Sequence, residues 1–99
     1  LTKEVCAEVA KPEWWNDKKL KALSARVVRA APNYVTANLM RAIVLRGQYG
    51  AWELGPRSAA EFREAAVHFE RAAALCNAPV GKAELAGDAD RCRSMAEVV

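Results

Sequence analysis

The chain has 99 residues, of which 53% are hydrophobic and 27% are charged, and its formal net charge is +3. This composition suits one small folded domain and excludes a disordered acidic or basic tail. The charge excess is mild, whereas dedicated nucleic-acid modules are usually more basic and more clustered.

Five helices are expected, separated by Pro and Gly. The first is short, at about residues 2–10, and ends at Lys11-Pro12 because proline disfavours helical backbone in the residue before it. The second is capped by Asn16 or Asp17 and runs to about Ala31. Its expected apolar stripe consists of Leu20, Leu23, Val27 and Ala31.

The third helix is expected at about Tyr34 to Gln48, and it is apolar around most of its circumference. Such a helix is usually buried between neighbours. A break rich in glycine follows it, and Trp52 lies within this break in the segment GAWELGP. No stretch shows sustained alternation of β-branched and polar residues, so no strand is expected.

The fourth helix, at about Ala59 to Cys76, has the clearest pattern. Ser58 and Glu61 form an S-x-x-E capping box at its start. Its apolar face is almost half alanine, which lets helix backbones approach closely. That face consists of Phe62, Ala65, Ala66, Phe69, Ala72, Ala73 and Cys76. The fifth helix is expected at about Val80 to Glu97, with Leu85, Ala89, Cys92 and Ala96 on one side.

The spacing of Ala65, Phe69 and Ala72, followed by Pro79, resembles the second helix of a tetratricopeptide repeat. The turn 30–33 is similar to the turn between repeats, the stretch 45–49 resembles the end of a first helix, and Ala86-Gly87 looks like the small-residue position of another first helix. The resemblance covers about residues 18–95, as a half repeat, a full repeat and another half.

The resemblance implies an all-α domain of antiparallel helical hairpins in a short right-handed superhelix, spanning residues 1–99 as a fragment of a longer chain. It also implies a non-enzymatic scaffold that binds a peptide or a partner protein on its concave face. The link from Tyr49 to Ala65 is about a dozen residues longer than a plain repeat hairpin allows. A non-repeat helical bundle with similar packing is therefore the alternative.

The first helices of such repeats line the groove, which predicts partner-binding residues on the third helix. The groove-facing set is Tyr34, Ala37, Asn38, Arg41 and Leu45, or a set shifted by two positions. Tyr34, Asn38 and Arg41 are the predicted polar contacts, because a lone charge such as Arg41 on an apolar helix needs solvent or a partner. The expected ligand is an acidic-aromatic or acidic-aliphatic segment.

Trp52 is the fourth predicted partner contact, because tryptophan is enriched at interface hot spots. The alternative is that Trp52 and Leu54 fold back over the helix ends. The exposed end helices, including Val5 and Val9, are expected to promote self-association.

Neither an enzyme, a metal site nor a cofactor is expected. His68 is the single histidine, read here as a residue at the boundary of the core, and no phosphate-binding or HExxH motif occurs. Cys6, Cys76 and Cys92 lie far apart without a CxxC pair, which indicates reduced thiols in an intracellular, cytoplasmic protein. No apolar run approaches the ~20 residues that cross a bilayer, so no membrane association is expected.

Two alternative functions remain open. The second helix carries a basic cluster near Trp14 and Trp15, which suits an accessory domain with a nucleic-acid-binding face. That cluster consists of Lys18, Lys19, Lys21, Arg26 and Arg29. The other alternative is a purely structural segment of a larger assembly.

Overall fold

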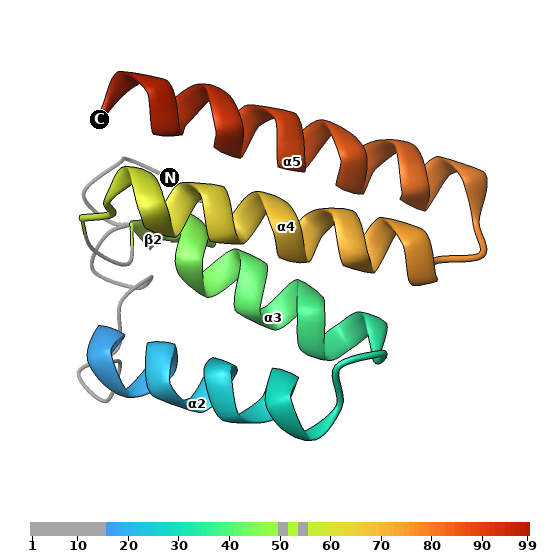
Figure 1. The fold of residues 1–99 in the computed structure, drawn as a ribbon, viewed down its shortest axis with the longest axis horizontal. Helices are drawn as coiled ribbons and strands as arrows, with labels where there is room; N and C mark the ends of the chain where they lie inside the picture. Colours follow the sequence, from blue (N-terminus) through green and yellow to red (C-terminus); the bar gives the residue numbers. More distant parts are fainter. Residues whose placement is uncertain (1–15, 50–51, 54–55) are drawn as a thin grey trace, which may run out of the picture.

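Four antiparallel helices make up most of the computed structural model, which describes residues 16–49, 52–53 and 56–99. They are α2 (Asp17–Ala30), α3 (Val35–Arg46), α4 (Ala59–Leu75) and α5 (Pro79–Val98). Figure 1 shows each helix beside its neighbour in chain order and running in the opposite direction. The all-α fold class is confirmed, whereas the expected first helix, at residues 2–10, lies outside the described residues.

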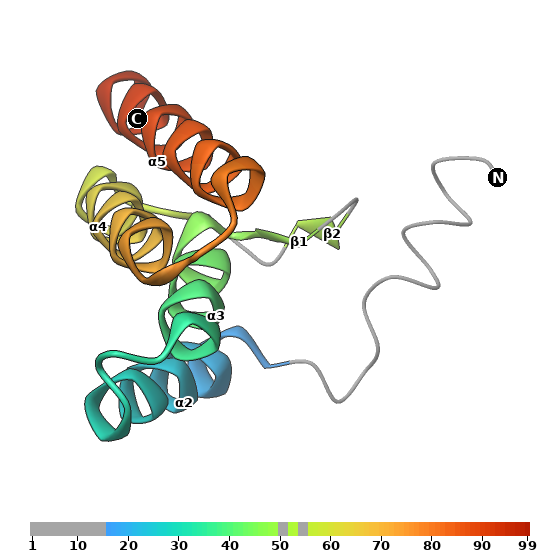
Figure 2. The same cartoon turned by 90° about the vertical axis from the view of Figure 1, so that its right-hand side faces the viewer.

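A short strand pair after α3 corrects the expectation of a chain without strands. β1 (Gln48–Tyr49) pairs antiparallel with β2 (Trp52–Glu53), and Tyr49 lies opposite Trp52. Gly47 ends α3 in the left-handed conformation, with φ of 77°, which glycine adopts without strain. Figure 2 shows this pair projecting on the side of the stack where α3 lies. Two residues a strand are too few to leave an alternating pattern in the sequence.

The predicted caps are confirmed at two helix starts. The Asn16 side-chain oxygen accepts a hydrogen bond from the backbone N–H of Lys19 at 3.0 Å. At the start of α4, the Ser58 hydroxyl accepts from the Glu61 N–H at 3.2 Å, and the Glu61 carboxylate accepts from the Ser58 N–H at 3.0 Å. These bonds satisfy backbone donors that a helix leaves open at its first turn.

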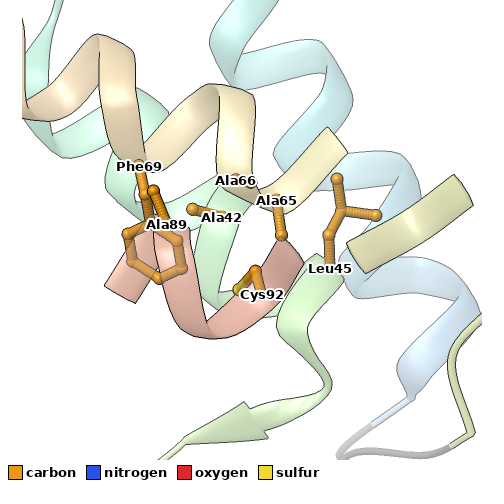
Figure 3. Packing of buried hydrophobic residues seen from close by; sticks show 7 residues of the cluster. All are labelled: Ala42, Leu45, Ala65, Ala66, Phe69, Ala89 and Cys92. Carbon is orange, nitrogen blue, oxygen red and sulfur yellow. The ribbon is translucent and has the colours of Figure 1, made fainter. Parts of the chain in front are cut away.

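The core lies between α3, α4 and α5, and small residues dominate it (Figure 3). Phe69 is its largest fully buried side chain, and alanines from α3, α4 and α5 surround it. The buried cluster consists of Ala42, Leu45, Ala65, Ala66, Phe69, Ala89 and Cys92. The predicted apolar faces of α4 and α5 are thereby confirmed, since small side chains bring the backbones close and the aromatic ring fills the remaining space.

The expected stripe of α2 is wrong at Leu23, whereas Leu20, Val27 and Ala31 are partly buried. Ser24 is its one buried residue, whereas Leu23 is 39% exposed. The Ser24 hydroxyl donates to the Lys21 carbonyl at 3.0 Å and accepts from Arg41 of α3 at 3.1 Å. A polar anchor between α2 and α3 therefore sets the rotation of α2, which hydrophobic periodicity does not report.

Replacing Phe69 by alanine tests the assigned core. Phe69→Ala should lower the free energy of unfolding by about 3–5 kcal/mol, because a large buried ring leaves a cavity among alanines that cannot close it. Val67→Ala on the exposed side of the same helix is the matched control and should cost under about 0.5 kcal/mol. Urea unfolding of both variants measures the difference, and equal losses would show that the face of α4 is misassigned.

A larger side chain in the core tests whether the helices approach closely. Ala65 is fully buried in the cluster, so Ala65→Leu should destabilise the fold by about 1–3 kcal/mol. Thermal melting followed by circular dichroism measures the loss. An unchanged or raised melting temperature would mean that α4 and its neighbours leave room for a larger side chain at this point.

Candidate functional site

The four predicted partner contacts do not form one cluster. Tyr34 precedes α3 and is 60% exposed, while Trp52 lies in β2 beyond the other end of α3. A helix of 12 residues separates these two by about 18 Å along its axis. Asn38 and Arg41 lie between them on α3, and the structure brings these two together through His68 and Glu64 of α4.

Of the two possible groove registers on α3, the first has three buried members, while its Tyr34 is exposed and its Arg41 is partly exposed. Ala37, Asn38 and Leu45 are 1%, 0% and 2% exposed, so they line the interior and not a groove. The register shifted by two positions lies toward solvent: Thr36 is exposed, and Leu39, Met40 and Ile43 are partly exposed. Asn38 therefore lies in the interior and Arg41 is partly exposed, and their roles as partner contacts stay predictions.

Asn38 fixes the turn between α2 and α3. Its amide nitrogen donates to the carbonyls of Pro32 at 2.9 Å and Tyr34 at 3.1 Å. Both donors of the amide group are thus used on backbone, which leaves the amide oxygen directed at Nδ1 of His68, 3.0 Å away. Buried polar groups need hydrogen-bond partners, and both the nitrogen and the oxygen of the Asn38 amide have them.

Arg41 joins three helices. Its Nη1 donates to the Lys21 carbonyl at 2.8 Å and to the Ser24 hydroxyl of α2. Its Nε donates to Oε2 of Glu64 on α4 at 3.1 Å, and Nη2 lies 3.0 Å from the same oxygen. The charge of Arg41 was expected to need solvent or a partner. Glu64 is that partner in the structure, where the Arg41 side chain is 14% exposed.

His68 completes this polar cluster on α4. Because the Asn38 oxygen accepts, the hydrogen-bond pattern assigns the proton of the neutral ring to Nδ1, and Nε2 lies 3.5 Å from Oε2 of Glu64. Burial lowers the pKa of His68, the nearby Arg71 and Arg41 lower it further, and Glu64 acts in the opposite direction. The predicted boundary histidine is thus a buried, 6% exposed residue whose neutral form is favoured.

A second ion pair, not foreseen from the sequence, closes the other end of the stack. Arg57 contacts both carboxylate oxygens of Asp17, with Nη2 to Oδ1 at 2.7 Å and Nη1 to Oδ2 at 3.0 Å. Its Nη2 and Nε also donate to the carbonyl of Val44 near the end of α3. The Arg57 side chain is 1% exposed, so this guanidinium ties the starts of α2 and α4 to the end of α3.

One signal in the sequence could have indicated these residues. Glu64 and His68 stand four residues apart beside the apolar face of α4, a spacing at which two helical side chains meet. Arg57 is a single cation directly before a helix cap, but its partner Asp17 is 40 residues away. Separation of that kind has no local signature.

A surface hollow lies where the α2–α3 turn meets the end of α4. Pro32 and Asn33 line it from the turn, and Arg71, Ala74 and Leu75 line it from α4. Its walls combine aliphatic groups with one guanidinium. Tyr34 follows Asn33 directly in the chain, so the exposed predicted contact is next in sequence to this hollow.

The described residues offer no metal site. Within residues 16–49, 52–53 and 56–99, no three His, Cys, Asp or Glu side chains are grouped so that they could hold an ion. Cys76 and Cys92 are free thiols rather than a bridge, and burial raises the pKa of Cys92. Across these same ranges, every helix is too short or too polar to cross a bilayer.

Comparisons with known proteins do not indicate a function, so a function has to be inferred from the geometry of the structure. No family model matches the chain, and no curated protein and no solved structure is significantly similar to it.

Removing Asp17 tests the buried guanidinium. Asp17→Ala leaves Arg57 without its carboxylate partner in a site that is 1% exposed, so unfolding should become about 3 kcal/mol easier. The matched control is Asp90→Ala, because that carboxylate is 81% exposed and should matter by under about 0.5 kcal/mol. Urea unfolding at neutral pH measures both, and a loss no larger than the control's would contradict the assigned role of Arg57.

The lowered pKa of His68 predicts acid-dependent stability. The folded pKa lies below the unfolded value of 6.5, so the unfolded chain takes up its proton first as the pH falls. The free energy of unfolding should therefore be fully retained above about pH 6.5 and should decline as the pH falls toward the folded pKa. Urea unfolding at about pH 7.5 and 5.5 spans this window, in which histidine is the side chain that ordinarily titrates.

The matched variant for this measurement is His68→Gln, which retains a side-chain amide near Asn38 but cannot titrate. Its stability should change less between the two pH values than that of the parent chain. A parent chain that gains stability at the lower pH, or a variant with an equal decline, would show that His68 is not held in its neutral form.

Proposed function

We propose that the chain is a non-enzymatic protein-interaction module of tetratricopeptide-like architecture, and that α3 and α5 carry its binding face. The antiparallel order of the helices and the alanine-rich contacts of α4 support this architecture. In helical-hairpin arrays, alternate helices line one side of the stack, and α3 and α5 are alternate helices here.

The observation that carries the proposal is a set of aliphatic side chains at the edge of the core. Leu39 and Ile43 of α3 and Leu85 of α5 pack against the buried cluster but remain partly open to solvent. Large aliphatic groups from two helices at one exposed edge provide apolar area that a partner can cover.

An ion pair and a ring contact hold the two helices of this face in place. Nη1 of Arg46 on α3 lies 3.8 Å from Oδ1 of Asp88 on α5. The same guanidinium lies over the Phe69 ring, 5.3 Å from its centroid, which links the face to the core. A face that is already ordered loses less conformational entropy when it binds.

The predicted polar contacts take different parts in this proposal. Asn38 and Arg41 do not contact the ligand in this proposal. They hold α3 against α2 and α4, and so determine which side of α3 carries the partly exposed aliphatic groups. Tyr34 is exposed at one end of α3, and the hairpin that contains Trp52 follows the other end. Both stay predicted partner contacts, as rings at the two ends of an apolar face.

Peptide selection followed by NMR mapping tests this function. Peptides selected from a random library should shift the amide and methyl signals of Leu39, Ile43 and Leu85. Ile43→Ser should weaken their binding by about tenfold, because it removes apolar contact area. Val67→Ser on the exposed side of α4 is the control and should change the affinity by under about twofold. Selection of no binder, or shifts confined to α2 and α4, would contradict the proposal.

A further inference from the structure

The outer sides of α2 and α4 carry cations that the fold does not use. On α2 they recur at helical spacing, and all are exposed. On α4 they stand eight residues apart, so they share a side of the helix, and both are exposed. The six residues, here called the cationic face, are Lys18, Lys19, Arg26, Arg29, Arg63 and Arg71.

α3 packs between the two helices of the cationic face, and side chains of α2 and α4 reach each other along one side of it. Nζ of Lys21 on α2 is 2.6 Å from Oε2 of Glu61 on α4, and Arg41 bridges the two helices further along. Figure 2 shows α2 and α4 on one side of the stack and α3 offset toward the other. The cationic face is therefore distinct from the aliphatic edge of α3 and α5.

The carboxylates of α2 and α4 are already engaged by other cations. Asp17 pairs with Arg57 and Lys21, and Glu61 pairs with Lys21. Glu64 pairs with Arg41, and Glu70 pairs with Arg93. By contrast, none of the six residues of the cationic face has an ion partner within the described ranges. Lys21 of the predicted basic cluster is thus structural, while the other four members remain open to a ligand.

The hollow beside Arg71 is lined by aliphatic groups, and the exposed ring of Tyr34 follows Asn33 in the chain. Arg71 borders the hollow formed with Pro32, Asn33, Ala74 and Leu75, and Val67 is 41% exposed one turn before it. Single-stranded nucleic acid is held by cations together with aromatic rings on which bases stack. The exposed large hydrophobic groups of α2 and α4 are Leu23 and Val67, which offer no such ring.

We propose that the cationic face binds an acidic segment of a partner protein. The carboxylates of this segment pair with Arg29, Arg71 and their neighbours, and one aliphatic side chain enters the hollow beside Arg71. The supporting argument is charge complementarity, since unpaired guanidiniums recognise carboxylates in bidentate geometry. An extended segment of about six residues spans the ~20 Å of α2. This surface is additional to the proposed α3–α5 face and does not depend on it.

Fluorescence anisotropy with defined probes tests the proposal. The probes are a labelled peptide of Asp and Leu residues, a peptide of the same charge with Ser in place of Leu, and a short DNA duplex. The Asp-Leu peptide should bind most tightly, the Ser peptide should bind more weakly, and rising salt should weaken both.

Charge reversal locates the site. Arg29→Glu with Arg71→Glu should weaken binding of the Asp-Leu peptide by about tenfold or more, because each replacement turns attraction into repulsion. Both side chains are exposed and unpaired within the described ranges, so the melting temperature should not change. Arg91→Glu on α5, at a side chain that is 71% exposed, is the control for each single reversal and should act less than about twofold.

The outcomes that overturn the proposal are specific. Tighter binding of the DNA duplex than of either peptide, lost in the Arg29/Arg71 variant, would assign the face to nucleic acid. Absence of binding at low salt, or an equal loss with Arg91→Glu, would remove the site altogether. Ile43→Ser separates this inference from the proposed function, because it should leave binding of the Asp-Leu peptide unchanged.

Discussion

The contact of Arg41 with Glu64 is the interaction on which the arrangement of these helices depends. Its guanidinium reaches α2 through the Lys21 carbonyl and the Ser24 hydroxyl, while its Nε and Nη2 hold the Glu64 carboxylate of α4. Glu64 extends the cluster to His68, and His68 extends it to Asn38 and the turn before α3. Asn38 and His68 are buried while Glu64 is 48% exposed, so the inner part of the cluster tolerates few alternative arrangements, because an unpaired buried group would cost free energy. The cluster therefore sets the rotation of α3, and the core of alanine and Phe69 supplies the apolar burial that stabilises it.

This rotation has a direct consequence for function. With Asn38 and Arg41 bonded to α2 and α4, Leu39 and Ile43 lie at the edge of the core and are partly open to solvent. The polar groups thus act as positioning residues for an apolar face. The exposed cations of α2 and α4 belong to a separate side of the stack, where the carboxylates are already paired. Both surfaces are proposals, and they differ in chemistry, because one is aliphatic and the other is cationic.

The parts of the fold that were predicted correctly are those with strong local signals. The capping box of Ser58 and Glu61 fixed the start of α4, and its Phe-Ala periodicity fixed its buried face. The sequence left two registers open for α3 because that helix is apolar on most sides, so periodicity favoured no direction. On α2, Leu23 was assigned wrongly because the polar Ser24, which contacts Arg41, takes the buried position. The structural role of Arg57 could not be predicted, because it depends on the ion pair with Asp17, which lies 40 residues away in the sequence. Long-range polar contacts of this kind follow from the packed structure and leave no periodic trace.

The register of α3 is the central claim, and solvent accessibility in solution measures it most directly. A soluble paramagnetic chelate broadens NMR signals in proportion to their exposure. The account predicts strong broadening of the Leu39 and Ile43 methyl signals and little broadening of the Asn38 side-chain amide and the Arg41 Nε proton. The reverse pattern, with the amide and guanidinium signals broadened and the methyl signals protected, would contradict it and restore the groove in which Asn38 and Arg41 face the partner.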